Sequence, residues 1–415
     1  MKKVLSLVLT LCLMLTMCFA AVGEAEEPVT INLWHRWSSS TEQALLNVIA
    51  GFEATHPNIH VEVTAKSGEY FALLQSMIAD AAAGNDLPDV FVGGYNLLNY
   101  IATELKPTAV DQLAPSQEAL DALYANFKPG MLELSQYDGV QVGLPYAVSI
   151  MPMYINMDLF TKAGLTEADI PTTWDEVAKV AAIITEKTDA IGVQIHNMED
   201  AWADQALVFS NGGQLLTADK QRCDFTNEGA LEAISMWQNL YTNGYASALS
   251  SSEIQSSFTS GNVAIYCTSI MSINTILNYS DFPVKVCKTP AFEGHDLALP
   301  SGGAALISFT QDDAKKAAVW EFLNYAAGEG MQGWAEESGY LCPTDIELEL
   351  NEYMQAAYDC LPYAVTWECW PGGSIGMEID RMWINARNEI LWEGADVNET
   401  LSALEEECNT MLEMS

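Results

Sequence analysis

Few residue groups in this chain combine the types and the spacing that catalysis needs. The stretch Gly372-Gly-Ser374-Ile-Gly376 fits the Gly-x-Ser-x-Gly pattern of a nucleophilic serine, and a helical pattern follows it. In the hydrolase fold that uses this pattern, a histidine comes after the serine in the chain. The five histidines stand at positions 35, 56, 60, 196 and 295, so none follows Ser374. We therefore interpret the stretch as a glycine-rich loop.

Metal and cofactor chemistry also lacks a signal. His56 and His60 are four residues apart, as on a zinc-binding helix. Pro57 lies between them, and the residues that follow alternate like a strand, which argues against a metal pair. The cysteines show no Cys-x-x-Cys and no metal-ligand spacing. With no phosphate-binding loop and no dinucleotide fingerprint either, the sequence predicts no metal and no cofactor.

Acidic residues dominate the charge. The chain has 56 Asp and Glu against 17 Lys and Arg, which gives a net charge of -39. With so many carboxylates, neighbouring pairs arise by chance, so they do not argue for a glycosidase. Such a surface repels nucleic acid and anionic lipid, and neither is expected as a partner.

The chemistry that the residues do favour is binding. Sugars are bound by aromatic faces that pack on the C–H side of the ring and by polar groups that bond the hydroxyls. Five aromatic side chains stand at the ends of predicted elements: Trp34, Tyr70, Tyr95, Trp202 and Tyr340. Each of these positions is as typical of a half-buried surface residue as of a ligand contact.

The elements that must position these residues alternate between strand and helix. Strand patterns cover residues 30–34, 59–63 and 88–92, and helix patterns cover residues 41–52 and 71–83. Alternation of this kind predicts an α/β fold with a largely parallel sheet. Ligands bind outside the carboxyl ends of such strands, which would put residues 34–36, Tyr70 and Tyr95 on one rim.

A second folded unit is expected after residue 143. The 415 residues leave room for two domains. Residues 143–160 begin with a Gly-x-Pro break and continue as alternating apolar residues up to a polar turn at Asn156. This pattern predicts a strand that leaves one unit and enters the other.

The first 25 residues are predicted to be a secretion signal, with Lys2 and Lys3 ahead of an apolar run and small residues at the cleavage positions. A second interpretation is a lipobox at residues 15–18, in which Cys18 would tether the chain to the membrane. Seven cysteines remain after the signal, an odd number, and we interpret them as buried apolar residues. Only the short loop from Cys360 to Cys369 suits a bridge.

Several motifs together resemble one family. Residues 143–146 are G-L-P-Y, and residues 154–165 fit Y-x-N-x-D-L-F-x-K-A-G-L. Further matches are P-N-I-x-V-x-V at 57–63, G-N-x-L-P-D-V at 84–90, P-x-T-W-D-E at 171–176, F-x-x-G at 258–261, G-G at 302–303 and W-x-x-x-x-G-Y-L at 334–341. Their order and spacing over about 380 residues resemble the extracellular solute-binding proteins of ABC transporters, in the maltodextrin- and glycerol-3-phosphate-binding group.

The resemblance implies the type II periplasmic-binding-protein fold, which has two α/β lobes joined by hinge crossings near Pro145, Pro290 and Pro343. Lobe 1 would consist of residues 28–144 and 291–343, and lobe 2 of residues 145–290 and 344–415. Two amphipathic helices, split at Gly394, would end the chain, as in the family.

The resemblance also implies binding residues. The motif positions that contact ligand in glycerol-3-phosphate-binding relatives fall here on Tyr70, Ser149, Ser269, Gly303, Tyr340 and Arg381. Together with residues at the predicted rim, the predicted ligand-binding set is Trp34, His35, Tyr70, Tyr95, Ser149, Trp202, Ser269, Gly302, Gly303, Tyr340 and Arg381. One departure is that those relatives have a glutamate after the third strand, where this chain has Gly94-Tyr95.

The function implied is the secreted solute-binding component of an ABC importer, not an enzyme. It would bind a carbohydrate or a glycerol-3-phosphate-like solute between its lobes and deliver it to the permease subunits. Two alternatives stay open from the sequence: a secreted carbohydrate-active hydrolase or lyase, and a sensor without a transport role on the same fold.

Overall fold

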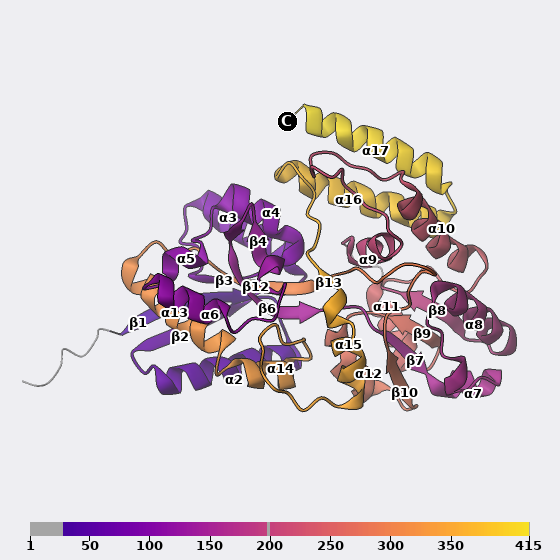
Figure 1. The fold of residues 1–415 in the computed structure, drawn as a ribbon, viewed down its shortest axis with the longest axis horizontal. Helices are drawn as coiled ribbons and strands as arrows, with labels where there is room; N and C mark the ends of the chain where they lie inside the picture. The colour runs from indigo at the N-terminus through magenta and orange to yellow at the C-terminus, as the bar shows by residue number, and fades with distance from the viewer. Residues whose placement is uncertain (1–27, 197–199, 415) are drawn as a thin grey trace, which may run out of the picture.

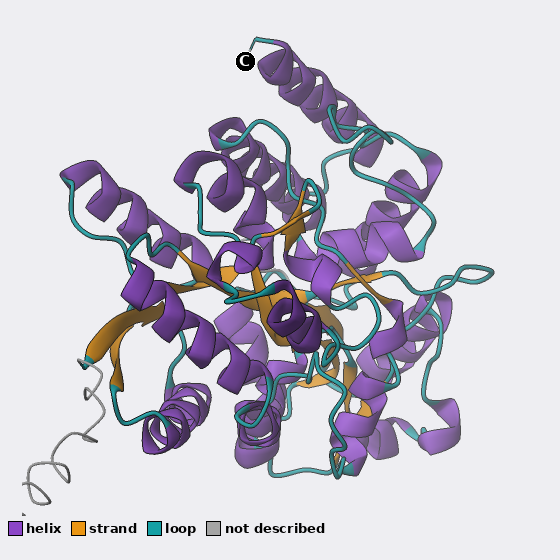
Figure 2. Ribbon diagram, turned by 60° about the vertical axis from the view of Figure 1, so that its left-hand side comes forward, coloured by secondary structure: helices purple, strands orange, loops and turns teal. Residues whose placement is uncertain are grey.

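A computed structural model describes residues 28–196 and 200–414. The predicted secretion signal, with Cys18, lies outside the described residues. Two main sheets lie side by side along the longest axis of the molecule, and helices pack around both of them (Figure 1). Figure 2 shows the same arrangement from a second direction, with strands inside and helices outside.

The first sheet has the strand order β2-β1-β3-β12-β6. Its strands are β1 Val29–His35, β2 Ile59–Ala65, β3 Val90–Gly94, β6 Gly143–Ser149 and β12 Gly302–Ser308. Strand β1 pairs in parallel with β2 and β3, as the strand and helix alternation predicted. Strand β12 comes from late in the chain and pairs antiparallel with β3 and β6.

The helices of this unit follow the predicted periodicity. Helix α2, Ser39–Thr55, buries Leu45, Val48, Ile49 and Phe52 against the sheet. Helix α3, Tyr70–Ala83, ends at Gly84, whose φ of 74° is the left-handed conformation of a helix C-cap.

Strand β6 extends past the predicted crossing at Pro145. Proline lacks the N–H that a ladder needs, so it is tolerated at sheet edges and bulges. Both conditions hold here, because β6 is an edge strand and its pairing with β12 shifts register between Ala304 and Ala305. The chain therefore leaves the first sheet only after Ser149.

The second sheet has the order β10-β7-β9-β8, with β7 Met153–Asn156, β8 Ile191–Ile195, β9 Val263–Cys267 and β10 Val284–Cys287. Helix α8, Trp174–Lys187, begins at a capping box of Thr173 and Glu176, at the predicted helix start. Helices α9, Trp202–Ser210, and α11, Ser251–Thr259, also belong to this side. Residues 143–160 thus run from one sheet into the other, but as two strands, β6 and β7, followed by a helix, where the sequence predicted a single strand.

The chain ends in two helices split at Gly394, as predicted. Helix α16 spans Ser374–Asn388 and continues as the π-helical turn Glu389–Glu393. Gly394 then adopts a φ of 75°, and α17 spans Val397–Glu413. The glycine-rich stretch forms a loop up to Gly373 and enters α16 at Ser374.

The remaining helices and short strands are α4 Leu98–Tyr100, α5 Val110–Leu113, α6 Gln117–Tyr124, α7 Met157–Ala163, α10 Glu228–Thr242, α12 Ile273–Tyr279, α13 Asp313–Ala327, α14 Met331–Ser338, α15 Glu352–Tyr358, β4 Gln136–Tyr137, β5 Val140–Gln141, β11 Leu299–Pro300 and β13 Ala364–Val365.

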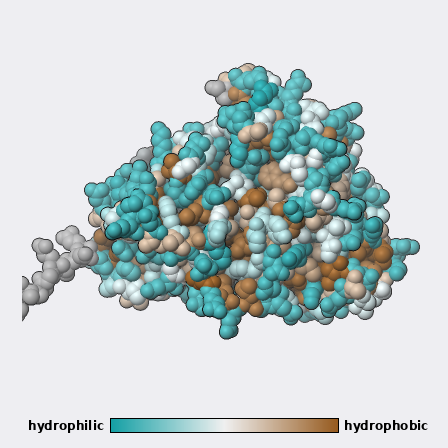
Figure 3. Space-filling model, in the orientation of Figure 1, coloured by the Kyte–Doolittle hydropathy of each residue, from teal (hydrophilic) through white to brown (hydrophobic). Residues whose placement is uncertain are grey.

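The surface is mostly polar, as the space-filling view in Figure 3 shows for one face. Among residues 28–196 and 200–414, no helix combines the length and the hydrophobicity needed to cross a bilayer. Within the same ranges, no three His, Cys, Asp or Glu side chains are grouped to hold a metal ion. All seven cysteines of the described residues are free thiols, including Cys360 and Cys369.

Candidate binding site between the two sheets

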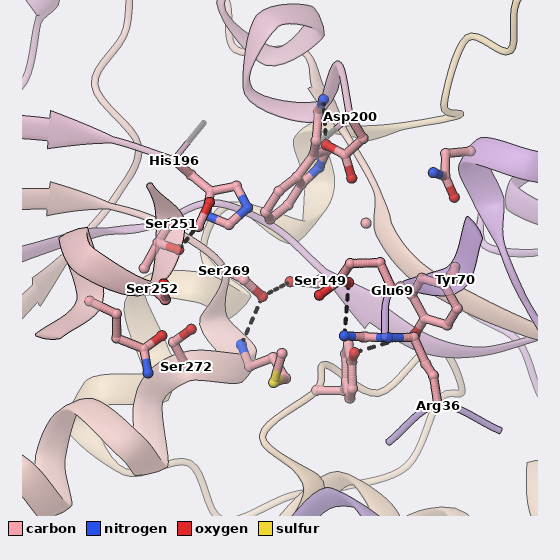
Figure 4. A pocket seen from close by; sticks show the side chains of 18 of the residues that line it. Arg36, Glu69, Tyr70, Ser149, His196, Asp200, Ser251, Ser252, Ser269 and Ser272 are labelled. Atoms are coloured by element: carbon pink, nitrogen blue, oxygen red, sulfur yellow. Dashed lines mark hydrogen bonds and ion pairs between the residues drawn. The ribbon is translucent and has the colours of Figure 1, made fainter. Parts of the chain in front are cut away.

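A cavity of about 390 Å³ lies between residues of the two sheets (Figure 4). On the side of the first sheet it is lined by Arg36, Glu69, Tyr70, Asn96, Ser149, Gly302, Gly303 and Tyr340. On the side of the second sheet it is lined by His196, Asp200, Trp202, Ser251, Ser252, Gln255, Ser256, Tyr266, Thr268, Ser269, Met271 and Ser272. Trp367, from the loop before α16, completes the lining.

An ion pair stands on the first wall. Arg36 follows β1 and bonds Glu69 Oε2 through a terminal nitrogen at 2.8 Å. Its Nε donates to the carbonyl of Gly68 at 2.8 Å, and its guanidinium lies over the Tyr70 ring, 4.8 Å from the centroid. Arg36 is the only Lys or Arg in the described lining, and its charge is already neutralised by Glu69.

Two tyrosine hydroxyls meet beside this pair. Tyr70 Oη accepts a hydrogen bond from Trp37 Nε1 at 3.2 Å and lies 3.5 Å from Tyr340 Oη. Burial raises the pKa of Tyr70 well above its usual value, so its phenol stays neutral. Tyr340 stacks on Trp334, with ring centroids 5.9 Å apart and planes at 11°. The first wall thus offers a rigid aromatic surface with hydroxyl groups.

Two glycines bring backbone to the cavity. Gly303 has a φ of 109°, and a Cβ there would overlap the carbonyl oxygen of Ala147 on β6. A Cβ on Gly302 would come within 3.0 Å of the Trp202 ring. Glycine is therefore required for the close pairing of β12 with β6, and it lets Trp202 pack on the backbone of the first sheet.

Two serines join the sheets. Ser149 ends β6, and Ser269 caps the short 3₁₀ helix Ile270–Ser272 by accepting from the Met271 N–H at 3.1 Å. The hydroxyls of Ser149 and Ser269 are 2.7 Å apart, so one donates to the other across the gap between the sheets. Figure 4 shows this contact near the middle of the cavity.

The second wall places a carboxylate beside an indole. Trp202 begins α9, and its Nε1 donates to the Pro300 carbonyl at 2.7 Å. Asp200 Oδ1 accepts from the Trp202 N–H at 3.1 Å. Burial raises the pKa of Asp200 to about 7, opposed by that N–H bond, and the nearby acids Asp380 and Asp204 add to the rise.

Below this wall lies a buried ion pair. Arg387, on α16, bonds Asp204 Oδ2 at 3.0 Å and donates to the Asp200 carbonyl at 3.1 Å. The side chains of Arg387 and Asp204 are 2% and 0% exposed. This pair fixes the start of α9, and with it Asp200 and Trp202, on α16.

Helix α11 adds hydroxyls and an amide from one end of the cavity: Ser251, Ser252, Gln255 and Ser256. The described lining as a whole joins aromatic rings with hydroxyl, amide and carboxylate groups. That combination suits hydrogen bonding to a ligand with several hydroxyls and packing on its C–H faces.

Seven of the eleven predicted residues line this cavity: Tyr70, Ser149, Trp202, Ser269, Gly302, Gly303 and Tyr340. The structure brings these together from distant parts of the chain. Their contact with a ligand stays a prediction.

The other four lie outside the lining, and their role in binding also stays a prediction. Trp34 alternates to the opposite face of β1, where Lys66 Nζ lies over its ring at 4.5 Å. His35 and Tyr95 are buried in the core. Arg381 is exposed on α16 and pairs with Glu378 one turn earlier, as expected for a helix surface in an acidic protein.

Sequence reasoning missed much of the second wall. His196, Asp200, Trp367 and the polar face of α11 were not predicted. One available signal was the position of His196 directly after an apolar strand pattern, where parallel sheets place ligands.

Comparisons with known proteins agree on one family. The family model described as bacterial extracellular solute-binding protein matches residues 37–333. The sn-glycerol-3-phosphate-binding periplasmic protein UgpB of Escherichia coli (strain K12) is 25% identical over 375 residues, which is 85% of this chain and 82% of that protein. A putative binding protein of Brucella abortus (strain 2308) is 24% identical over 340 residues, 77% of each chain.

Solved structures share the architecture. The cyclic alpha-maltosyl-1,6-maltose binding protein of Arthrobacter globiformis matches with a TM-score of 0.78 and 21% identity, over 94% of this chain and 100% of that chain. UgpB of Mycobacterium tuberculosis, in complex with glycerophosphocholine, matches with a TM-score of 0.79, 21% identity and the same coverage.

Proposed function

This chain belongs to the bacterial extracellular solute-binding protein family, and we propose that it binds a carbohydrate between its two lobes and delivers it to the permease of an ABC importer. The observation that supports this most directly is the cavity between the two sheets, with aromatic and hydroxyl groups on both walls. The family consists of binding proteins, so the alternatives of a secreted enzyme and of a sensor have no support beyond the fold.

The fold is the predicted α/β fold of two-lobed periplasmic sugar-binding proteins. We propose the predicted lobes, residues 28–144 with 291–343 and residues 145–290 with 344–415, with the first crossing moved to the end of β6 after Ser149. Ligand would bind one lobe first, and the second would close over it. Ligand favours the closed state only through the contacts it gains there.

A neutral carbohydrate suits the charges of the cavity better than a phosphate ester does. Arginine and lysine side chains with free donors strengthen phosphate binding through charge-assisted hydrogen bonds. The one Arg or Lys of the described lining, Arg36, is paired with Glu69, and the Asp200 carboxylate stands on the opposite wall.

A glycerol-phosphate-like solute is the second candidate. The specific observation in its favour is that Arg36 does reach the cavity wall, and relatives named for glycerol 3-phosphate align over most of this chain. Binding of such a ligand would require Arg36 to exchange Glu69 for the phosphate.

The extracellular location of the family agrees with a secreted chain. We further propose that residues 1–25 direct export, with Cys18 as the lipid-bearing residue in the second interpretation. Mass spectrometry of the exported protein distinguishes them, because cleavage before Cys18 leaves a lipid-bearing N-terminus.

The first test is a thermal-shift screen of the mature protein against maltose, maltotriose, glucose, glycerol, glycerol 3-phosphate and glycerophosphocholine. A ligand that binds the native state stabilises it by mass action and so raises the melting temperature. At a ligand concentration of a hundred times Kd, the gain in unfolding free energy is about 2.7 kcal/mol. We expect a neutral sugar to raise the melting temperature of the wild-type protein, and we expect no such rise for the Trp202→Ala variant. A shift only with the two phosphate esters would replace the proposal by the second candidate, and no shift with any probe would contradict both.

A further inference from the structure

His196 lies on the second wall with one ring nitrogen unused. It follows β8, and its backbone N–H donates to the Cys267 carbonyl at 2.8 Å, which fixes its position. Its Nδ1 lies 3.0 Å from the Thr268 hydroxyl. The residue is 6% exposed, and its Nε2 is buried with no hydrogen-bond partner among the described residues.

An unpaired buried polar atom needs an explanation. Buried polar side-chain atoms in native proteins nearly always have a partner, because leaving one unpaired costs free energy. This atom belongs to a residue that lines the main cavity, and Figure 4 shows the ring at the edge of that cavity. A group of the bound ligand is therefore the natural partner of Nε2.

The protonation state of His196 limits what that group can be. Burial lowers the pKa of His196 to about 3, and the positive charge of Arg387 acts in the same direction. The ring is therefore neutral at physiological pH, and Nε2 offers one donor or one acceptor, whichever the tautomer leaves. A hydroxyl can satisfy either tautomer, whereas an anion would require a donor in every case.

The neighbours of His196 complete a surface that fits a sugar ring. Its imidazole meets Trp202 edge to face, with centroids 5.6 Å apart and planes at 85°. Trp202 is held by Pro300, and Asp200 uses only Oδ1 within the described residues, toward the Trp202 N–H. An imidazole and a carboxylate thus stand next to one indole on a single wall.

We infer that His196 Nε2 and the Asp200 carboxylate bind neighbouring hydroxyls of a sugar ring that packs against Trp202. This inference rests on the proposed function and adds two specificity-determining residues to the cavity. Neither belongs to the set that the sequence predicted.

The test measures the Kd of the sugar that gives the largest thermal shift in the six-probe screen, by calorimetry. His196→Ala removes the Nε2 bond, and we expect at least a tenfold weaker Kd, which is the effect of about one hydrogen bond. His196→Gln, which keeps a polar group near Nε2, should recover part of the affinity. The matched control His295→Ala, at an exposed histidine, should leave Kd unchanged.

Asp200→Asn should weaken the binding of the same sugar by a similar factor in Kd, because the amide has one acceptor oxygen where the carboxylate has two. Asp313→Asn, at an exposed aspartate, is its control. A folded His196→Ala variant that binds within twofold of wild type would overturn the inference while leaving the proposed function intact. Failure of every sugar to bind wild type would overturn both.

If the His196→Ala variant does not fold, a second measurement on the wild-type protein tests the inference instead. In wild-type protein, the imidazole ¹⁵N resonances of His196 should shift when the sugar saturates the cavity. Unchanged resonances at saturation would also overturn the inference.

Discussion

The Arg36–Glu69 pair decides which charge the first wall presents. Both residues line the cavity, and their mutual bond of 2.8 Å leaves that wall without net charge. A ligand phosphate would have to compete with a carboxylate that is already in place. Specificity for neutral ligands would then depend on Glu69 as much as on any residue that touches sugar.

Glu69→Gln should convert this wall into an anion-binding one. The amide cannot neutralise Arg36, so we expect glycerol 3-phosphate to bind about tenfold more tightly, the effect of one charge-assisted hydrogen bond. Sugar affinity should change much less. Calorimetry on both ligands checks this, with Glu62→Gln as a control that removes the same charge from an exposed position of β2. Equal phosphate affinities in the two variants would contradict the role given to Glu69.

Two titrating residues of the second wall act on stability in opposite directions. The pKa of His196 is lowered to about 3 in the folded chain. Its contribution to folding stability is therefore fully present above the pKa of the unfolded chain, about 6.5, and is lost as the pH falls from about 6.5 to 3. Asp200 has a pKa raised to about 7, so its contribution is present below about pH 4 and is lost as pH rises to 7. Between pH 4 and 6.5 the two slopes oppose each other.

In the Asp200→Asn variant, the change of folding stability with pH that comes from His196 should no longer be opposed by Asp200. In this variant the urea midpoint should rise more steeply with pH between 4 and 6.5 than in wild type, because each pKa unit corresponds to about 1.4 kcal/mol. His196→Gln should show the reverse, a midpoint that falls relative to wild type as pH increases. Urea titrations at three pH values measure both effects, with Asp313→Asn, at an exposed aspartate, as the reference. Parallel pH curves for all four proteins would refute this account.

Among single residues, the sequence predicted those cavity-lining residues that lie within a motif. It missed the cavity-lining residues that lie outside any motif. Tyr70, Ser149 and Tyr340 were found because each stands in a patterned stretch, and all three line the cavity. His196 has no motif, and a histidine after a strand is equally typical of a core. Trp34 and Tyr95 were placed by their distance from a strand end, but the alternation of side chains along β1 turns Trp34 away.

At the scale of elements, the pairing of β12 with β6 depends on one glycine. Gly303→Ala would need a φ of 109° and would overlap the Ala147 carbonyl. We expect a loss of about 2–3 kcal/mol of unfolding free energy and weaker ligand binding, because the strand lines the cavity. Urea unfolding and calorimetry measure the two effects.

Gly333→Ala is the matched control. Gly333 is exposed in α14, and an added Cβ there meets nothing within 4 Å. Alanine should gain about 0.5–1 kcal/mol at this helical position. If Gly303→Ala and Gly333→Ala changed the unfolding free energy in the same direction, the close approach of β12 and β6 would not explain the effect of Gly303→Ala.

The contact between α9 and α16 depends on a buried ion pair. Arg387→Met leaves the buried Asp204 without its cationic partner, which should cost about 3–5 kcal/mol of unfolding free energy. Arg222→Met breaks an ion pair with Glu413 whose side chains are 50% and 63% exposed, and should cost no more than about 1 kcal/mol. Chemical denaturation of the two variants compares them directly, and similar losses would mean that burial is not decisive.

Elements were predicted well where periodicity and end signals agreed. Residues 41–52 and 71–83 lie in α2 and α3, and the split at Gly394 separates α16 from α17. Strand β6 continues through Pro145 to Ser149, because proline is compatible with an edge strand beside a bulge. Edge position is a property of the assembled sheet, which no local pattern reports.

At the scale of the whole molecule, we expect the two lobes to approach each other when ligand binds. The Ser149–Ser269 contact already links the sheets at the cavity. For a compact chain of this length the radius of gyration is about 22 Å. Saturating sugar should lower the value measured by small-angle scattering, and Trp202→Ala should show no change. Identical scattering of free and saturated wild-type protein would contradict closure.

Strand β12 has a consequence for how the chain can be made. It lies inside the first sheet, between β3 and β6, yet it comes from residues 302–308. The ribosome must therefore synthesise about three quarters of the protein before the sheet that begins at residue 29 can close. Until then β3 and β6 each lack a neighbour, and the nascent chain cannot lock into its final form. If residues 1–25 direct export, as proposed, this delay would keep the polypeptide in the unfolded state that a secretion channel requires.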